Sequence, residues 1–356
     1  MSQRKWSNVY AFVCVLLMIA GYVALFLFAI KGEVLDGIRA IVGVVLGIVF
    51  APVFHELGHI LFAKMSNFSI IYSKFFCFKL TRKGKRLRFS FSSPFAPDET
   101  QAVPNCGGNM YARARAYTLG GLLFGGIFLF VVLLISILLT VYYAPNYLFF
   151  GMLPYALYLF ILNVLPFEYP MGKTDMAVAL GLRRGDDVEK TMLSAMEIQG
   201  ELFLGKSYSE IEETLYFNLP QLSEEEPLFF VILDLKYRFY LDKNDLKNAA
   251  DCLNRLVMSQ DYFLDEEREK LAAECVYMHS IQGDLEKAEE CGKLCANFLR
   301  TENVTAKRVL ATFSSAFGKC DAVPVLKEQA NKALSLEFVA GNAKFEKGLL
   351  DRIGCE

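Results

Sequence analysis

Four long apolar stretches dominate the first half of the chain. Each is uncharged or nearly so, and they cover residues 9–30, 40–63, 117–143 and 147–167. A helix of about 20 apolar residues is long enough to span a bilayer, and every stretch meets that length. The pattern therefore predicts four transmembrane helices. The first is expected to stay attached, because its apolar run is too long for a signal peptide and no small-x-small cleavage site follows it.

The hydrophobic period changes between the second and third apolar stretches. In residues 74–93, KFFCFKLTRKGKRLRFSFSS, apolar side chains occupy alternate positions at Leu87, Phe89 and Phe91, after a glycine-centred basic turn. This alternation around a turn is typical of a β-hairpin. We expect a small cytoplasmic hairpin that either lies against the inner face of the helix bundle or contacts anionic lipid headgroups.

From about residue 186 the composition becomes that of a soluble helical protein. KNDLKNAADCLNRL, residues 243–256, and QGDLEKAEECGKLC, residues 282–295, match at a 39-residue offset that aligns Asp245 with Asp284. Short polar turns between amphipathic helices, repeated at such an interval, resemble tetratricopeptide-type helical hairpins, which stack into solenoids. We expect this part to bind a cytoplasmic protein or peptide. The alternative is a helical bundle that only caps the membrane part.

The distribution of basic residues predicts the topology. Arg4 and Lys5 lie near the N-terminus, and residues 65–116 carry nine Lys or Arg against two acids. Such segments face the cytoplasm by the positive-inside rule, which leaves the loops at 31–38 and 144–146 outside. The chain is thus expected to be a multi-pass cell-membrane protein in a lipid bilayer, with cytoplasmic N- and C-termini and no nucleic-acid partner. Four spans with short loops suggest a prokaryotic source.

Glycines at four-residue spacing occur in two of the predicted spans. Gly43 and Gly47 lie in the second, and Gly121 and Gly125 in the third. Small residues at this spacing let membrane helices approach closely. We expect the second and third helices to pack directly against each other.

The second apolar stretch contains the sequence HELGH, with polar side chains at His55, Glu56 and His59. Charged or metal-binding groups are costly at membrane depth and need a compensating role. A four-residue spacing places both imidazoles on one helical face, where they can bind one Zn²⁺. Glu56 then lies beside the metal and can take a proton from an activated water, which is the chemistry of peptide hydrolysis. The alternative is a chance match on a polar patch of a buried helix.

The fourth apolar stretch ends in NVLPFEYPMGKTDMA, residues 163–177, where an asparagine, two prolines and an aspartate gather. The helix must break there, and a break at membrane depth is tolerated only where the backbone lines protein or a water-filled cavity. Together with HELGH, the basic hairpin and the glycine-rich third helix, this segment resembles the site-2 protease family of intramembrane zinc metalloproteases over residues 36–180. The resemblance implies these site residues: zinc ligands His55, His59 and Asp175, general base Glu56, and groove-shaping Asn163 and Pro166.

The sequence departs from the family pattern in two places. Asp175 lies further from Asn163 than the family's aspartate usually does, and Met176 follows it where a glycine is usual. Glu168 therefore stays open as an alternative third ligand. The glycine-rich stretch at 119–126 also lacks the proline and asparagine usual there, so the pairing with a substrate strand is expected to differ.

The sequence thus predicts a mainly α protein in two parts. Residues 1–180 are expected to form a polytopic membrane bundle of four helices with a small β-hairpin, and residues 186–356 a soluble α-helical repeat domain. The expected function is an intramembrane zinc metalloendopeptidase that cleaves membrane-embedded or membrane-proximal segments of a membrane protein substrate. The alternative is a non-catalytic scaffold of the same fold. A transporter fits poorly, because the spans show no internal duplication.

Overall fold

The computed structural model is mainly helical and divides into two compact units. It describes the whole chain apart from residues 1, 84–85, 95–97, 170–171 and 355–356. The first unit comprises residues 1–82, 87–103 and 109–189, and the second comprises 83–86, 104–108 and 190–356.

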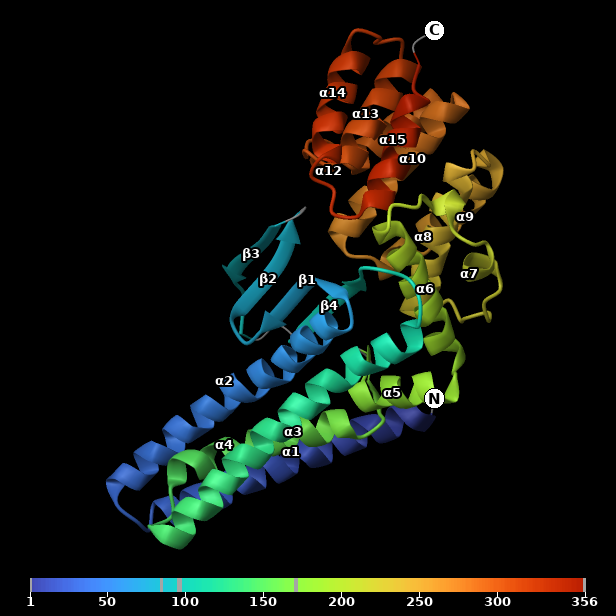
Figure 1. The fold of residues 1–356 in the computed structure, drawn as a ribbon. Coiled ribbons are helices and arrows are strands. Elements are labelled where there is room, and N and C mark those ends of the chain that lie inside the picture. The colour runs from blue at the N-terminus through green and yellow to red at the C-terminus, as the bar shows by residue number, and fades with distance from the viewer. Residues whose placement is uncertain (1, 84–85, 95–97, 170–171, 355–356) are drawn as a thin grey trace. The chain divides into compact units, whose positions relative to one another are not determined.

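All four predicted spans are helices in the first unit (Figure 1). Their bounds are α1 (Ser2–Ala29), α2 (Val34–Met65), α3 (Met110–Tyr142) and α4 (Tyr147–Val164). Each is long and apolar enough to cross a membrane. Helix α3 begins earlier than the apolar pattern predicts, because the side chain of Asn109 caps it by accepting a hydrogen bond from the Ala112 amide.

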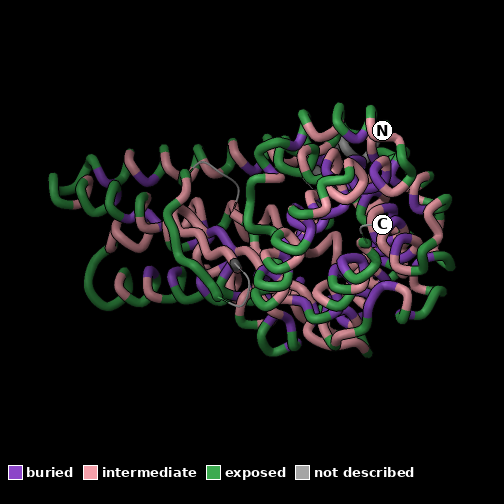
Figure 2. Tube along the Cα trace, turned by 90° about the horizontal axis from the view of Figure 1, so that it is seen from above, coloured by how far each residue is buried: buried purple, intermediate pink, exposed green. Residues whose placement is uncertain are grey.

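The outer faces of these helices are apolar. Leu17 is 63% exposed, Phe130 63% and Val141 70%. Figure 2 shows exposed and half-buried positions along the long helices, with buried positions recurring between them. Side chains of this kind are unfavourable in contact with water but suit a hydrocarbon environment.

Glycines bring the backbones of α2, α3 and α4 into contact. A Cβ atom added at Gly43 would lie 2.1 Å from the carbonyl oxygen of Leu148, and one at Gly58 would lie 2.2 Å from that of Gly120. Helices α2 and α3 therefore pack directly, as predicted. The prediction was wrong about Gly43 and Gly47, however, since both face α4 rather than α3.

The predicted hairpin is half of a four-stranded sheet with the strand order β3-β2-β1-β4. The strands are β1 (Phe68–Phe75), β2 (Phe78–Lys83), β3 (Arg86–Phe91) and β4 (Glu99–Pro104). Strands β2 and β3 fall within residues 74–93, although the centre of their turn lies outside the described residues. The hydrophobic pattern missed β1 and β4 because β1 reads FSIIYSKF without strict alternation and β4 is short and polar.

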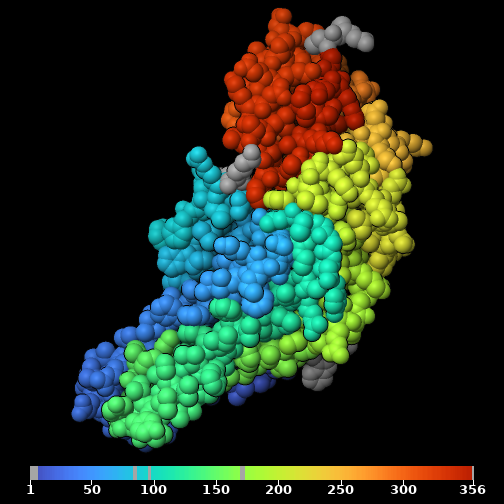
Figure 3. Space-filling view, in the orientation of Figure 1, coloured from blue at the N-terminus to red at the C-terminus, as the bar shows by residue number. Residues whose placement is uncertain are grey.

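Strand β1 joins the sheet to the helices. It pairs antiparallel with β2, with Tyr72 opposite Thr81, and it packs against α2. The buried Lys74 ammonium lies 2.7 Å from a carboxylate oxygen of Asp98, just before β4. Figure 3 shows the strands as a continuous patch of surface beside one end of α2.

The chain reverses direction after α4. A short hairpin of β5 (Glu168–Tyr169) and β6 (Gly172–Lys173) leads into α5 (Asp175–Arg184), which packs against α3. Thr174 caps α5 by accepting a hydrogen bond from the Ala177 amide, and Gly185 ends it with a left-handed φ of 71°. Helix α6 (Asp187–Phe203) follows.

The second unit is built mainly from helix pairs. Its longer helices are α8 (Pro227–Asp242), α9 (Leu246–Met258), α10 (Asp265–Gln282), α11 (Leu285–Leu294), α13 (Val304–Ala316), α14 (Ala322–Leu334) and α15 (Ala340–Asp351). Shorter helical segments are η1 (Tyr208–Glu210), α7 (Thr214–Phe217), η2 (Gln260–Tyr262) and α12 (Ala296–Leu299). Helix α8 packs with α9, α10 with α11, and α13 with α14.

The two matched sequence segments form equivalent turns in this unit. Asp245 caps α9 and Asp284 caps α11, each accepting from the backbone amide three residues on. The preceding residues, Asn244 and Gly283, both have left-handed φ angles. The hydrogen bonds from Asn248 and from Lys287 hold the pKa of each capping aspartate below its ordinary value. The resemblance to tetratricopeptide repeats beyond these turns stays a prediction.

A buried ionic network lies inside the second unit. The Arg308 guanidinium donates to Glu274 at 2.6 Å and to Glu346 at 2.7 Å, and Tyr237 donates to the other oxygen of Glu274. Thr305 also donates to Glu346. Breaking such a pair in a dry core typically costs about 3–5 kcal/mol, so this network fixes the relative arrangement of α8, α10, α13 and α15.

Candidate metal centre

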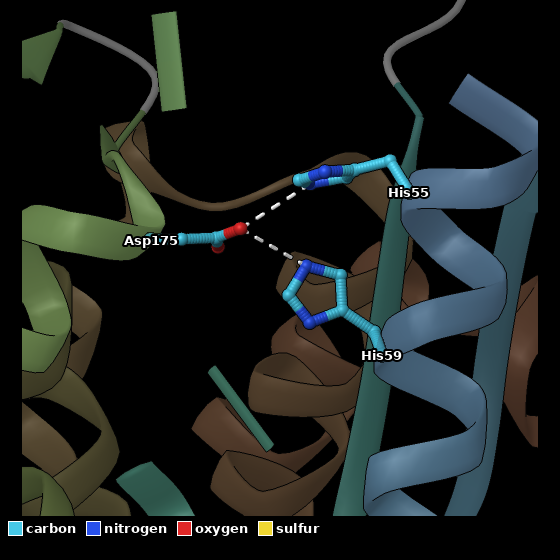
Figure 4. A group of neighbouring side chains, drawn as sticks. All are labelled: His55, His59 and Asp175. Atoms are coloured by element: carbon cyan, nitrogen blue, oxygen red, sulfur yellow. Dashed lines mark ion pairs between the residues drawn. The ribbon is translucent and has the colours of Figure 1, made fainter. Parts of the chain in front are cut away.

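Two histidines and an aspartate converge in the first unit. His55 and His59 lie one turn apart on α2, and the Nε2 atom of each lies 3.3 Å from Oδ2 of Asp175. Figure 4 shows both imidazole rings directed toward the aspartate, which approaches from α5. The two histidine rings stand nearly perpendicular, with centroids 4.9 Å apart. Residues separated by more than a hundred positions in sequence thus meet at one point.

The geometry of this group fits a tetrahedral metal ion. Two ligand atoms that lie about 2.0–2.1 Å from a tetrahedral ion are separated by about 3.3 Å, which matches the separation of Asp175 Oδ2 from each imidazole nitrogen. Asp175 Oδ2 is buried and has no hydrogen-bond partner among the described residues, and both histidines are only 8% exposed. A buried carboxylate oxygen aimed at two imidazole nitrogens is a suitable donor set for zinc.

Glu168, the alternative third ligand, lies elsewhere. It belongs to β5 and pairs across the hairpin with Lys173. Within the described part of the chain, His55, His59 and Asp175 form the one group of His, Cys, Asp or Glu with the spacing of a metal site. The structure therefore places Asp175, and not Glu168, beside the histidines.

Helix α3 fixes the orientation of His59. Nδ1 of His59 lies 3.0 Å from the carbonyl oxygen of Tyr117. Because a carbonyl only accepts, Nδ1 carries the proton and Nε2 keeps its lone pair for a metal. Gly121 lies against the same ring, and a Cβ atom there would be 2.3 Å from Nε2. The glycine-rich pattern of α3 thus makes room for a ligand as well as for helix packing.

Glu56 is held by the sheet. Its side chain is 5% exposed, and Thr100 of β4 donates a hydrogen bond to Oε2 at 2.6 Å. The Ser73 hydroxyl lies 2.9 Å from the Thr100 hydroxyl, and Tyr117 donates to the Thr100 carbonyl. One carboxylate oxygen is therefore occupied and oriented. Sequence reasoning missed Thr100 and Ser73, since neither β1 nor β4 was predicted.

The two residues expected to shape a substrate groove lie at the end of α4. Asn163 donates to the carbonyl oxygen of Leu159, one turn back on its own helix. Pro166 is exposed and follows Leu165, where the helix ends. Neither belongs to the metal group, and their role in substrate binding stays a prediction.

A cavity of about 710 Å³ opens in the second unit. Helices α8 and α10 supply much of its lining, including Phe230, Tyr237 and Glu274, and Phe263 and Asn303 add to it. Its size falls in the range of ligand and peptide side-chain pockets. Tyr237 and Glu274 of the buried network therefore face the same space as the rings of Phe230 and Phe263.

Comparison with known proteins identifies no family for this chain. No protein-family model matches the chain, and no curated protein or solved structure matches it. The chemistry of the metal centre is therefore argued from its own residues.

The role of Gly121 can be tested by substitution. Gly121→Ala places a methyl group against Nε2 of His59, so we expect a loss of metal affinity of about tenfold or more. Gly125→Ala is the matched control, because its Cβ would lie 3.5 Å from Nδ1 of His55, an ordinary contact. Metal content of the purified full-length protein, measured by mass spectrometry, gives the result. Equal metal content in the two variants would contradict the packing argument.

Proposed function

We propose that this chain is an intramembrane zinc metalloendopeptidase that resembles the site-2 proteases. The observation that carries the proposal is the convergence of His55, His59 and Asp175, with the buried carboxylate of Glu56 beside them. All lie on or next to helices apolar enough to cross a membrane. The substrate class is then a membrane-embedded or membrane-proximal segment of another protein.

The residues divide the chemistry between them. His55, His59 and Asp175 would hold the zinc, which gives the three protein ligands typical of a catalytic site. When bound, zinc would act as a Lewis acid that lowers the pKa of water and polarises a peptide carbonyl. Glu56 takes a proton as general base and returns it to the leaving amine. Thr100 keeps one oxygen of Glu56 fixed, which leaves the other free for proton transfer.

A non-catalytic scaffold is the alternative, and the environment of Glu56 argues against it. A buried carboxylate is costly unless it has a specific partner. A scaffold gains nothing from keeping Glu56 ordered by Thr100 next to two imidazoles, whereas a hydrolase needs a base at that position. We assign the scaffold role to the second unit alone.

The second unit would recruit a partner protein or regulate cleavage. The cavity beside Phe230 and Glu274 offers space for a segment of a cytoplasmic protein or peptide. Helix pairs in soluble proteins bind partners more often than they catalyse. On this proposal the chain is a multi-pass cell-membrane protein whose two termini are cytoplasmic.

The identity of the third ligand gives a direct test. We expect Asp175→Asn to lose most bound zinc, because the neutral amide is a poor ligand, and Glu168→Gln to keep it. Zinc per protein molecule, measured after dialysis against a weak chelator, separates the two. Zinc retained by Asp175→Asn but lost by Glu168→Gln would mean that the other carboxylate completes the site.

The role of Glu56 is tested by separating metal binding from cleavage. Glu56→Gln should keep zinc and lose cleavage by about 10²–10⁴-fold or more, because the amide cannot take a proton. His55→Ala should lose both. A membrane-protein fraction retained by Glu56→Gln, identified by mass spectrometry, supplies the substrate for the assay. Cleavage at the normal rate by Glu56→Gln would end the protease proposal.

Topology is tested with cysteine labelling in intact cells. Leu87→Cys, in a background without other accessible thiols, should resist a membrane-impermeant thiol reagent, because β3 is expected in the cytoplasm. Lys31→Cys, in the loop between α1 and α2, is the control and should be labelled. The reverse result would place the sheet on the outer side.

A further inference from the structure

A buried carboxylate outside the metal centre contacts the segment that carries Asp175. Glu189, in the first turn of α6, is only 2% exposed. Its Oε1 atom accepts a hydrogen bond from the Lys173 ammonium at 2.7 Å. Lys173 is the last residue of β6 and precedes the aspartate by two positions. The ion pair therefore acts on the chain just before the ligand.

The same carboxylate also packs against α5, the helix that begins with Asp175. A Cβ atom at Gly181 of α5 would lie 2.5 Å from Cδ of Glu189. Only a glycine leaves room for this approach. Glu189 thus contacts both β6 and α5, on either side of Asp175.

Local hydrogen bonds also hold this segment. Thr174 donates to the carbonyl of Leu165 at 2.7 Å, and its amide donates to the carbonyl of Phe167 at 3.0 Å. These bonds close the base of the β5–β6 hairpin onto the end of α4. They fix the shape of the turn, and the packing of α5 against α3 and the contacts of Glu189 both act on the direction of α5.

The two kinds of ligand are held very differently. His55 and His59 belong to a 32-residue helix whose backbone is locked by glycine contacts. Asp175 belongs to the first turn of a 10-residue helix, which follows a hairpin whose two strands have two residues each. Metal ligands must be held within about 0.5 Å of their productive positions, so the short segment needs an external support.

We propose that the ion pair between the half-buried Lys173 and the buried Glu189 is a positioning pair that holds Asp175 against the two histidines and thereby sets the affinity for zinc. This inference rests on the proposed function only for the identity of the metal. An ion pair, whether partly or fully buried, typically contributes little net stability. A pair in this position is therefore better explained by the geometry that it imposes than by stability.

The test measures zinc affinity and local order in the same full-length protein. Glu189→Gln keeps the size of the side chain and removes its charge. We expect its zinc dissociation constant, from competition with a chromophoric chelator, to rise about 10–100-fold, as for other residues that support metal ligands. Amide hydrogen exchange in residues 172–178 should become faster, while exchange in the second unit stays unchanged.

Two further variants sharpen the result. Asp186→Asn removes an exposed ion pair with Arg184 in the adjacent α5–α6 connection and should leave both measurements unchanged. Lys173→Met should behave like Glu189→Gln, and the double variant should be no worse than the more affected single one, because the two residues act as a unit. Additive losses would overturn the pairing.

The outcomes separate this inference from the proposed function. Unchanged exchange and unchanged zinc affinity in Glu189→Gln would overturn the positioning role. Faster exchange throughout the first unit would assign Glu189 to general stability and would also overturn it. If the wild-type protein binds no zinc, the proposed function fails, and the exchange of residues 172–178 alone then decides whether the pair holds the segment.

Discussion

The cost of burying charge is the constraint on which the first unit depends. His55, Glu56 and His59 lie on a helix that is otherwise apolar between Arg39 and Lys64, and a polar group in such a place must have a partner. Asp175 pairs with both histidines, and Thr100 donates a hydrogen bond to Glu56. The chain reversal after α4 and the sheet beside α2 are thus the two structures that supply these partners. Without either, the helix would carry uncompensated polar groups.

Close approach of backbones makes this arrangement possible. Gly58 and Gly120 bring α2 and α3 into backbone contact, and Gly121 accommodates the ring of His59. A larger residue at any of these positions would separate the helices or displace the imidazole. Gly181 acts in the same way, because the absence of a side chain there leaves room for the carboxylate of Glu189. Glycine therefore serves the chemistry of the centre as much as the packing of the bundle.

The second unit is held together by different interactions. Its helices are joined by polar turns in which Asp245 and Asp284 cap the following helix, and its core contains the network around Arg308. Such capping and buried pairing give a defined shape without help from a lipid environment. On the proposed function, the cavity beside this network would serve recognition and the candidate metal centre hydrolysis. On the proposed function, one chain combines a cutting site with a separate binding surface.

The sequence by itself determined the features that depend on local geometry. Apolar length specified four long helices, and the spacing of His55 and His59 specified two imidazoles on one face, because both follow from the rise and twist of a helix. It left Asp175 and Glu168 as alternatives and gave no sign of Thr100 or Glu189. Those contacts depend on how the chain turns after α4 and on which strands pair with β1. No local periodicity in the sequence indicates either of these. Only the tertiary structure decided them, because they join segments that the sequence separates by as many as 120 positions.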